Sequence, residues 1–78
     1  MMGNKKTPQS DELKKLMAIA TDLTIAAELR IKAIELVGNM STHDALLALL
    51  EIVANTKLVT KERELALKRA GEIVKSER

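Results

Sequence analysis

The chain of 78 residues contains no cysteine, which excludes disulfide bonds, thiol chemistry and metal sites with cysteine ligands. It also contains no phenylalanine, tyrosine or tryptophan. Any core must therefore be built from leucine, isoleucine, valine, alanine and methionine, side chains that suit helices packed at close range. The missing aromatic rings also remove the platforms on which nucleic-acid bases stack.

Long apolar segments are absent as well. The longest apolar run, residues 45–50, is far shorter than the roughly 20 residues that cross a bilayer. The basic residues near the N-terminus are not followed by an apolar segment, so we expect no secretory signal there. The sequence therefore predicts a cytoplasmic protein that does not enter the membrane.

The overall composition is that of one small folded domain. Hydrophobic residues make up 46% and charged residues 31% of the chain, and the net charge is +2. Residues 1–9 are polar, contain the only proline and are predicted to form a flexible N-terminal lead, while residues 10–78 form a single helical domain. A domain of this size needs an efficient helical core or an oligomer, because it buries a modest share of its surface.

Helical periodicity predicts an all-α fold with four helices, over about residues 10–20, 24–38, 42–55 and 61–75. Apolar residues recur at i, i+3, i+4 and i+7 in the first of them, and no stretch alternates with a period of two. Ser10 and Thr60 are predicted N-caps, and Ser41 begins a capping-box pattern. Gly38 with Asn39 is predicted to end the second helix. Short connections then make two antiparallel hairpins, over about residues 10–39 and 41–76.

The two predicted hairpins resemble each other in sequence. The pattern Asp, Leu, Leu and Ile in residues 11–19 recurs 33 residues later in residues 44–52. The segment KAIELV at residues 32–37 is echoed by RAGEIV at residues 69–74, which is an offset of 37. We interpret this as a repeated helical hairpin whose second copy has a longer loop, and repetition at this period is typical of helical solenoids.

The second predicted helix resembles the second helix of a HEAT repeat. The similarity lies in the pair Leu29–Arg30, the small residue Ala33, and the pair Val37–Gly38. With an offset of 37 the second unit departs from this pattern, because leucine 67 and lysine 75 take the places of the arginine and the glycine. The resemblance implies an α-solenoid fragment that makes protein–protein contacts, without enzymatic activity.

The two middle helices are apolar around most of their circumference, which predicts that each is covered on more than one side. Either two hairpins stack as in a solenoid fragment, or the four helices close into a compact four-helix bundle. Two stacked hairpins would leave apolar surface uncovered, and a two-fold homodimer is the simplest way to cover it. Leu47, Leu50 and Val53 are the predicted partner-binding residues, with plain core as the alternative.

Arg30 lies on the apolar side of its helix, and a buried arginine needs a paired acid. The HEAT-like turn places Asp22 as its predicted ion-pair partner, with Asp44 and Glu51 as alternatives. We interpret the pair as structural rather than as an anion site.

No residue pattern predicts catalysis or a bound cofactor or metal. His43, the single histidine, has no partner at a useful spacing and is predicted to be solvated beside a helix cap. The basic residues of the last helix alternate with glutamates, which indicates a solvated face. The leading hypothesis is therefore a non-enzymatic adaptor that binds protein and self-associates, and the alternative is a basic helical protein associated with nucleic acid.

Overall fold

A computed structural model describes residues 8–76 of the chain. These residues form four α-helices: α1 (Pro8–Ala20), α2 (Ala27–Met40), α3 (His43–Ala54) and α4 (Thr60–Ser76). The predicted all-helical class with four helices is confirmed for this part of the chain. Helix α1 begins at Pro8 and so includes the last two residues of the predicted lead, while residues 1–7 lie outside the described residues.

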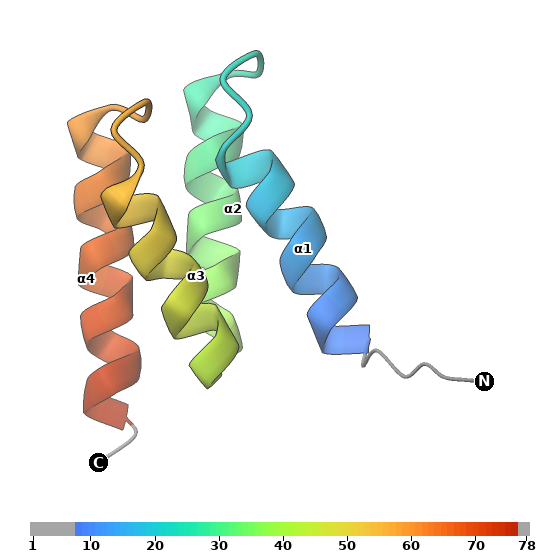
Figure 1. The fold of residues 1–78 in the computed structure, drawn as a ribbon, viewed down its shortest axis with the longest axis vertical. Helices are drawn as coiled ribbons and strands as arrows, with labels where there is room; N and C mark the ends of the chain where they lie inside the picture. The colour runs from blue at the N-terminus through green and yellow to red at the C-terminus, as the bar shows by residue number, and fades with distance from the viewer. Residues whose placement is uncertain (1–7, 77–78) are drawn as a thin grey trace.

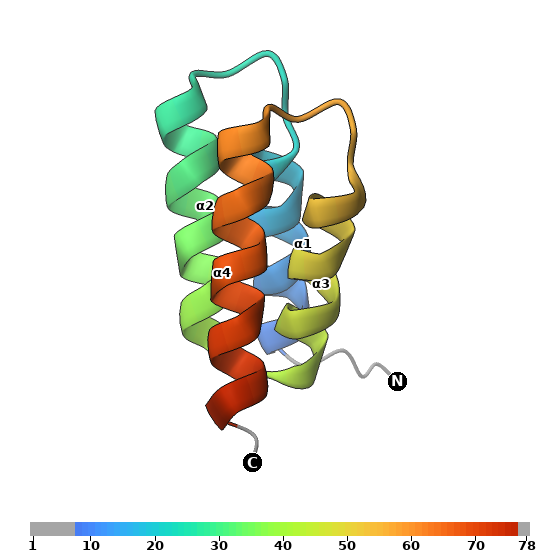
Figure 2. The ribbon, with the colours of Figure 1, turned by 90° about the vertical axis from the view of Figure 1, so that its left-hand side faces the viewer.

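The four helices form two antiparallel hairpins that stack side by side (Figure 1). Helices α2 and α4 lie next to each other in one layer, and α1 and α3 lie in the other (Figure 2). Helix α2 is central, because it packs against all three of the others. Within residues 8–76, α1 and α4 do not contact each other. Each hairpin therefore has one face against its neighbour and one face at an outer edge of the stack.

The connection between α2 and α3 differs from the sequence prediction. Helix α2 continues beyond Gly38 and ends at Met40, and Ser41 takes the left-handed conformation, with φ of 54°. Thr42 is the N-cap of α3, because its hydroxyl accepts the amide hydrogen of Ala45 (3.0 Å). The predicted capping residue Ser41 is instead used to end the preceding helix, so the cap is one residue further along.

The loops inside the two hairpins are built in the same way. The Asp22 carboxylate accepts the amide of Thr24 (2.9 Å), and the Asn55 side-chain oxygen accepts the amide of Lys57 (3.0 Å). Both are turns in which an Asx side chain replaces a main-chain acceptor. Asp22 and Asn55 are 33 residues apart, as are the first residues of α2 and α4.

The whole hairpin therefore repeats with one offset of 33 residues, and the offset of 37 inferred for the second half is wrong. In the structural register Arg63 corresponds to Arg30, and Gly71 corresponds to Gly38. The amides of both arginines bond to the carbonyl four residues earlier, in Ala26 and Val59. The segment RAGEIV misled the alignment because amphipathic helices share apolar spacings even when they are out of register.

One apolar core runs through both hairpins. It contains many alanines, which let the helices approach closely, and larger side chains fill the spaces between them. The fully or almost fully buried apolar residues are Ala20, Ala33, Ile34, Val37, Ala45, Leu46, Ala48, Leu49, Ile52, Leu58, Ala66, Ala70 and Ile73. The predicted polar stripe of α2 is exposed, as expected from its sequence pattern.

The two corresponding glycines have different surroundings, which leads to a matched prediction. A Cβ at Gly38 would meet the side chain of Arg69, whose own Cβ lies 3.0 Å away, whereas a Cβ at Gly71 meets nothing within 4 Å. In dilute solution we expect Gly71→Ala to raise the free energy of unfolding by about 0.5 kcal/mol through helix propensity. Gly38→Ala should gain less or lose stability. Equal gains in urea unfolding would contradict the close approach of α4 to Gly38.

Candidate functional site

A buried ion pair joins the two hairpins. The Arg30 guanidinium donates from Nε to Oε1 of Glu62 (3.0 Å) and from Nη2 to Oε2 (3.1 Å). The Glu62 residue is 1% exposed and Arg30 is 8% exposed. This is a bidentate pair between α2 and α4, and its fixed geometry sets how the hairpins align.

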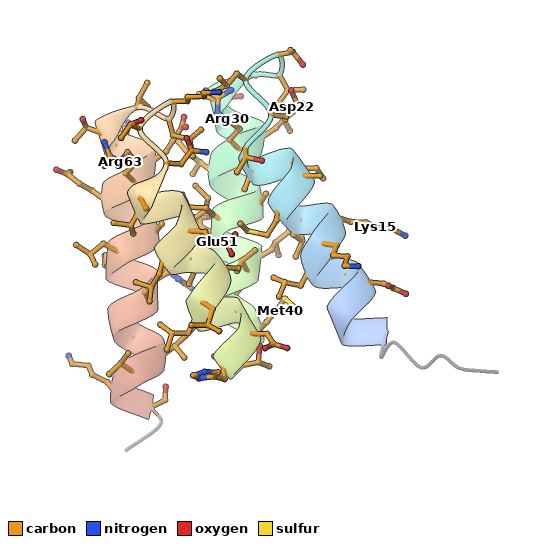
Figure 3. All side chains as sticks on the ribbon, in the orientation of Figure 1. Lys15, Asp22, Arg30, Met40, Glu51 and Arg63 are labelled. Atoms are coloured by element: carbon orange, nitrogen blue, oxygen red, sulfur yellow. The ribbon has the colours of Figure 1, made fainter. Side chains whose placement is uncertain are left out.

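The remaining donor of Arg30 faces the loop between α1 and α2. Its Nη1 donates to the main-chain carbonyls of Asp22 (3.1 Å) and Ile25 (2.8 Å). Figure 3 shows Arg30 beside Asp22 at the loop end of α2. The hydrogen bonds to Glu62 raise the pKa of Arg30, so the guanidinium remains charged in the folded protein.

The predicted pair of Arg30 with Asp22 is thus replaced by a different arrangement. Asp22 contacts the guanidinium through its main-chain oxygen, and its carboxylate accepts both the hydroxyl (2.6 Å) and the amide of Thr24. These bonds, led by the Thr24 hydroxyl, lower the pKa of the Asp22 carboxyl. Glu62 was not considered as the partner in the sequence analysis. A uniform offset of 33 would have placed it beside Arg63, the counterpart of Arg30.

The predicted partner-binding residues of α3 differ in their exposure. Leu47 is 48% exposed and Leu50 is 42% exposed, so both side chains are accessible. Val53 is half-buried and packs against the core. Leu49, between the two exposed leucines, is completely buried. Only part of the predicted set is therefore available at the surface.

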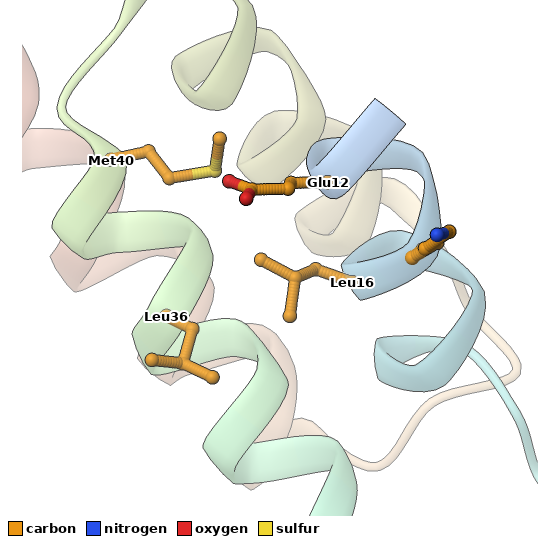
Figure 4. Close-up of a pocket in the computed structure, with 5 residues that line it drawn as sticks. Glu12, Leu16, Leu36 and Met40 are labelled. Atoms are coloured by element: carbon orange, nitrogen blue, oxygen red, sulfur yellow. The ribbon is translucent and has the colours of Figure 1, made fainter. Parts of the chain in front are cut away.

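A larger apolar surface lies at the outer side of the first hairpin, which we name the N-terminal edge. Leu16 and Leu36 face each other there across the groove between α1 and α2 (Figure 4). Two adjoining hollows, of about 350 and 400 Å³, share these two leucines. The N-terminal edge consists of Glu12, Lys15, Leu16, Ile19, Leu29, Lys32, Leu36 and Met40.

Residues of the N-terminal edge correspond to the residues with which the second hairpin packs onto the first. Ile19 is 42% exposed, whereas its counterpart Ile52 is fully buried. Leu29 is 51% exposed, and its counterpart is Glu62, the buried partner of Arg30. Leu36 is also exposed, and its counterpart is Arg69, which lies over Gly38. The first hairpin thus presents an uncovered copy of a packing surface.

The outer side of the second hairpin forms the C-terminal edge. A hollow of about 250 Å³ opens there between α3 and α4, beside exposed side chains that follow the helical spacing of α4. The guanidinium of Arg63 donates from Nε to the main-chain carbonyl of Val53 (2.8 Å) within this edge. The C-terminal edge consists of Leu50, Val53, Thr60, Arg63, Glu64, Leu67, Gly71 and Val74.

Other chemistry finds little support in residues 8–76. His43 is exposed at the start of α3. No group of three histidine, aspartate or glutamate side chains in this part of the chain is arranged to hold a metal ion. None of the four described helices is long and apolar enough to cross a membrane.

Comparison with known proteins identifies no relative. No family model matches the chain, and no curated protein or solved structure is significantly similar to it.

Proposed function

We propose that the protein is a non-enzymatic interaction module, a small adaptor that binds protein through the apolar edges of its hairpin stack and self-associates. The observation that carries the proposal is the uncovered N-terminal edge. Ile19, Leu29 and Leu36 are each more than 40% exposed and border a continuous groove. An apolar surface of this kind, flanked by Glu12, Lys15 and Lys32, is typical of a protein-binding site.

We also propose that the hairpins are HEAT-like. The 33-residue register supports this, because the second hairpin then carries the arginine and the glycine of the resemblance at Arg63 and Gly71. Ala66 and Ala70 take the places of the small residue and of the apolar residue before the glycine. Both units then follow the pattern on which the resemblance rests, and stacked helical hairpins commonly present binding surfaces along their sides.

The proposal is tested with one edge variant and one charge-matched control. Leu36→Glu places a charge in the middle of the N-terminal edge, and Ala18→Glu places the same charge at an exposed position of α1 outside it. Both glutamates are good helix formers, so both variants should fold. Proteins captured from an extract of the source cells by immobilised wild type and by Ala18→Glu should be lost with Leu36→Glu.

Capture that is equal for all three proteins would show that the N-terminal edge does not bind. Far-UV circular dichroism of each variant checks that the helices are retained. Quantitative mass spectrometry compares the captured proteins, and the chain itself is among those expected.

A further inference from the structure

We infer that the partner at the N-terminal edge is the C-terminal edge of a second copy of this chain, docked head to tail so that the stack of hairpins continues from one molecule into the next. The inference rests on the proposed function and specifies its partner. It follows from the internal repeat, because the interface between the two hairpins is a template for an interface between copies.

The template has two surfaces, and each has an uncovered counterpart. The first hairpin contributes Arg30, Ile34 and Gly38 to the internal interface, and all three are buried there. Their counterparts in the second hairpin are Arg63, Leu67 and Gly71, on the C-terminal edge. Leu67 is 55% exposed, although its counterpart Ile34 is fully buried. The C-terminal edge is therefore the surface onto which a further hairpin would stack.

The shapes of the two edges match at the glycine. In the internal interface the side chain of Arg69 lies over Gly38. Applying the same relation between copies places Leu36 of the second copy over Gly71. The space at Gly71 is open, with no atom within 4 Å of a built Cβ, and Leu36 is half-exposed. An apolar side chain would thus cover a helix position that offers room for it.

The charges beside this contact are also complementary. In the internal interface Ile31 and Glu35 of α2 line a hollow with Lys61, Leu65 and Lys68 of α4.

Shifting each residue of that hollow by one repeat describes the contact between copies. Glu64 and Lys68 of one copy then face Glu28, Lys32 and Glu35 of the other. Lys32 is placed opposite Glu64, and Lys68 is placed near Glu35. Opposite charges at matched positions favour this register over a shifted one.

One feature of the template is not repeated. The buried acid Glu62 corresponds to Leu29 at the N-terminal edge, so Arg63 of one copy would meet a leucine rather than a carboxylate. Arg63 already donates to the carbonyl of Val53, and its aliphatic stem can cover Leu29. The contact between copies therefore lacks the ion pair of the internal one, which makes it weaker and reversible.

Two variants that each block one edge test the geometry. Leu36→Glu blocks the N-terminal edge. Gly71→Gln blocks the C-terminal edge and favours the helix, because glutamine is a better helix former than glycine. Molecular mass is followed by sedimentation equilibrium over a concentration series, with interference optics because the chain has no aromatic absorbance.

Head-to-tail docking makes a specific prediction for these proteins. Wild type and Ala18→Glu should grow in mass beyond a dimer as concentration rises, because each added copy leaves one edge open. Each blocked variant alone should stay a monomer. An equimolar mixture of the two should form a dimer and grow no further, because one intact edge of each kind remains. If either variant fails to fold, Leu29→Glu or Leu67→Glu takes its place.

Three results would overturn the inference. A blocked variant that dimerises alone indicates a two-fold interface, and a mixture that stays monomeric while wild type associates places the interface elsewhere. Wild type that remains a monomer at all concentrations excludes self-association. In each case, capture of another protein that is lost with Leu36→Glu would leave the proposed binding function in place.

Discussion

Replacing Glu62 with alanine is expected to lower the midpoint of thermal unfolding by about 10 °C, because it leaves the Arg30 guanidinium buried between the hairpins without its carboxylate. The two main-chain carbonyls of Asp22 and Ile25 can satisfy one nitrogen of the guanidinium and leave the charge uncompensated. Far-UV circular dichroism during heating measures the midpoint.

Two controls separate this effect from a general loss of a glutamate. Glu64→Ala removes an exposed carboxylate from the same helix and should change the midpoint by about 2 °C or less. The double variant Arg30→Met with Glu62→Leu should recover most of the loss, because a packed apolar pair replaces a buried ion pair at little cost. A Glu62→Ala protein as stable as the Glu64→Ala protein would show that the ion pair does not hold the hairpins together.

The second large effect is expected at Leu49. This side chain is completely buried between the hairpins, so Leu49→Ala should lower the free energy of unfolding by about 3 kcal/mol through lost burial and the cavity left behind. Urea unfolding followed by circular dichroism gives this value. In so small a domain, such a loss is a large part of the total stability.

Neighbouring leucines of α3 provide the comparison. Leu47→Ala and Leu50→Ala remove the same atoms from side chains that are nearly half-exposed, and each should cost about 0.5 kcal/mol or less in dilute solution. If Leu50→Ala is as costly as Leu49→Ala, then Leu50 belongs to the core, which was the alternative left open by the sequence.

The helices and their hairpin pairing could be predicted from the sequence because apolar periodicity is a local signal. The helix ends were less accurate: α2 was expected to end at Gly38 and instead reaches Met40, since Ser41 adopts the left-handed conformation. A single sequence does not show which polar residue near a loop ends one helix and which begins the next. Thr42 and Ser41 are adjacent, and both are common caps.

The candidate site was harder to predict because it depends on which side of an all-round apolar helix is covered. Leu36 and Val37 are adjacent on α2, yet one is half-exposed and the other is fully buried. Helical spacing alone does not distinguish them when both sides of the helix are apolar. The partner of Arg30 was missed for a related reason: Glu62 is 32 residues away, and the incorrect offset of 37 gave no cause to align α2 and α4 at that point.

The most direct test of the account is a dilution series of the uniformly ¹⁵N-labelled wild-type chain, observed by amide NMR. If the two edges bind each other, the amide shifts of Leu36 and Met40, and of Leu67 and Gly71, should change with concentration together. The amide of Ala18, on the exposed side of α1 away from both edges, should not change. Shifts that are independent of concentration, or that change at Ala18 and not at the edges, would contradict the account.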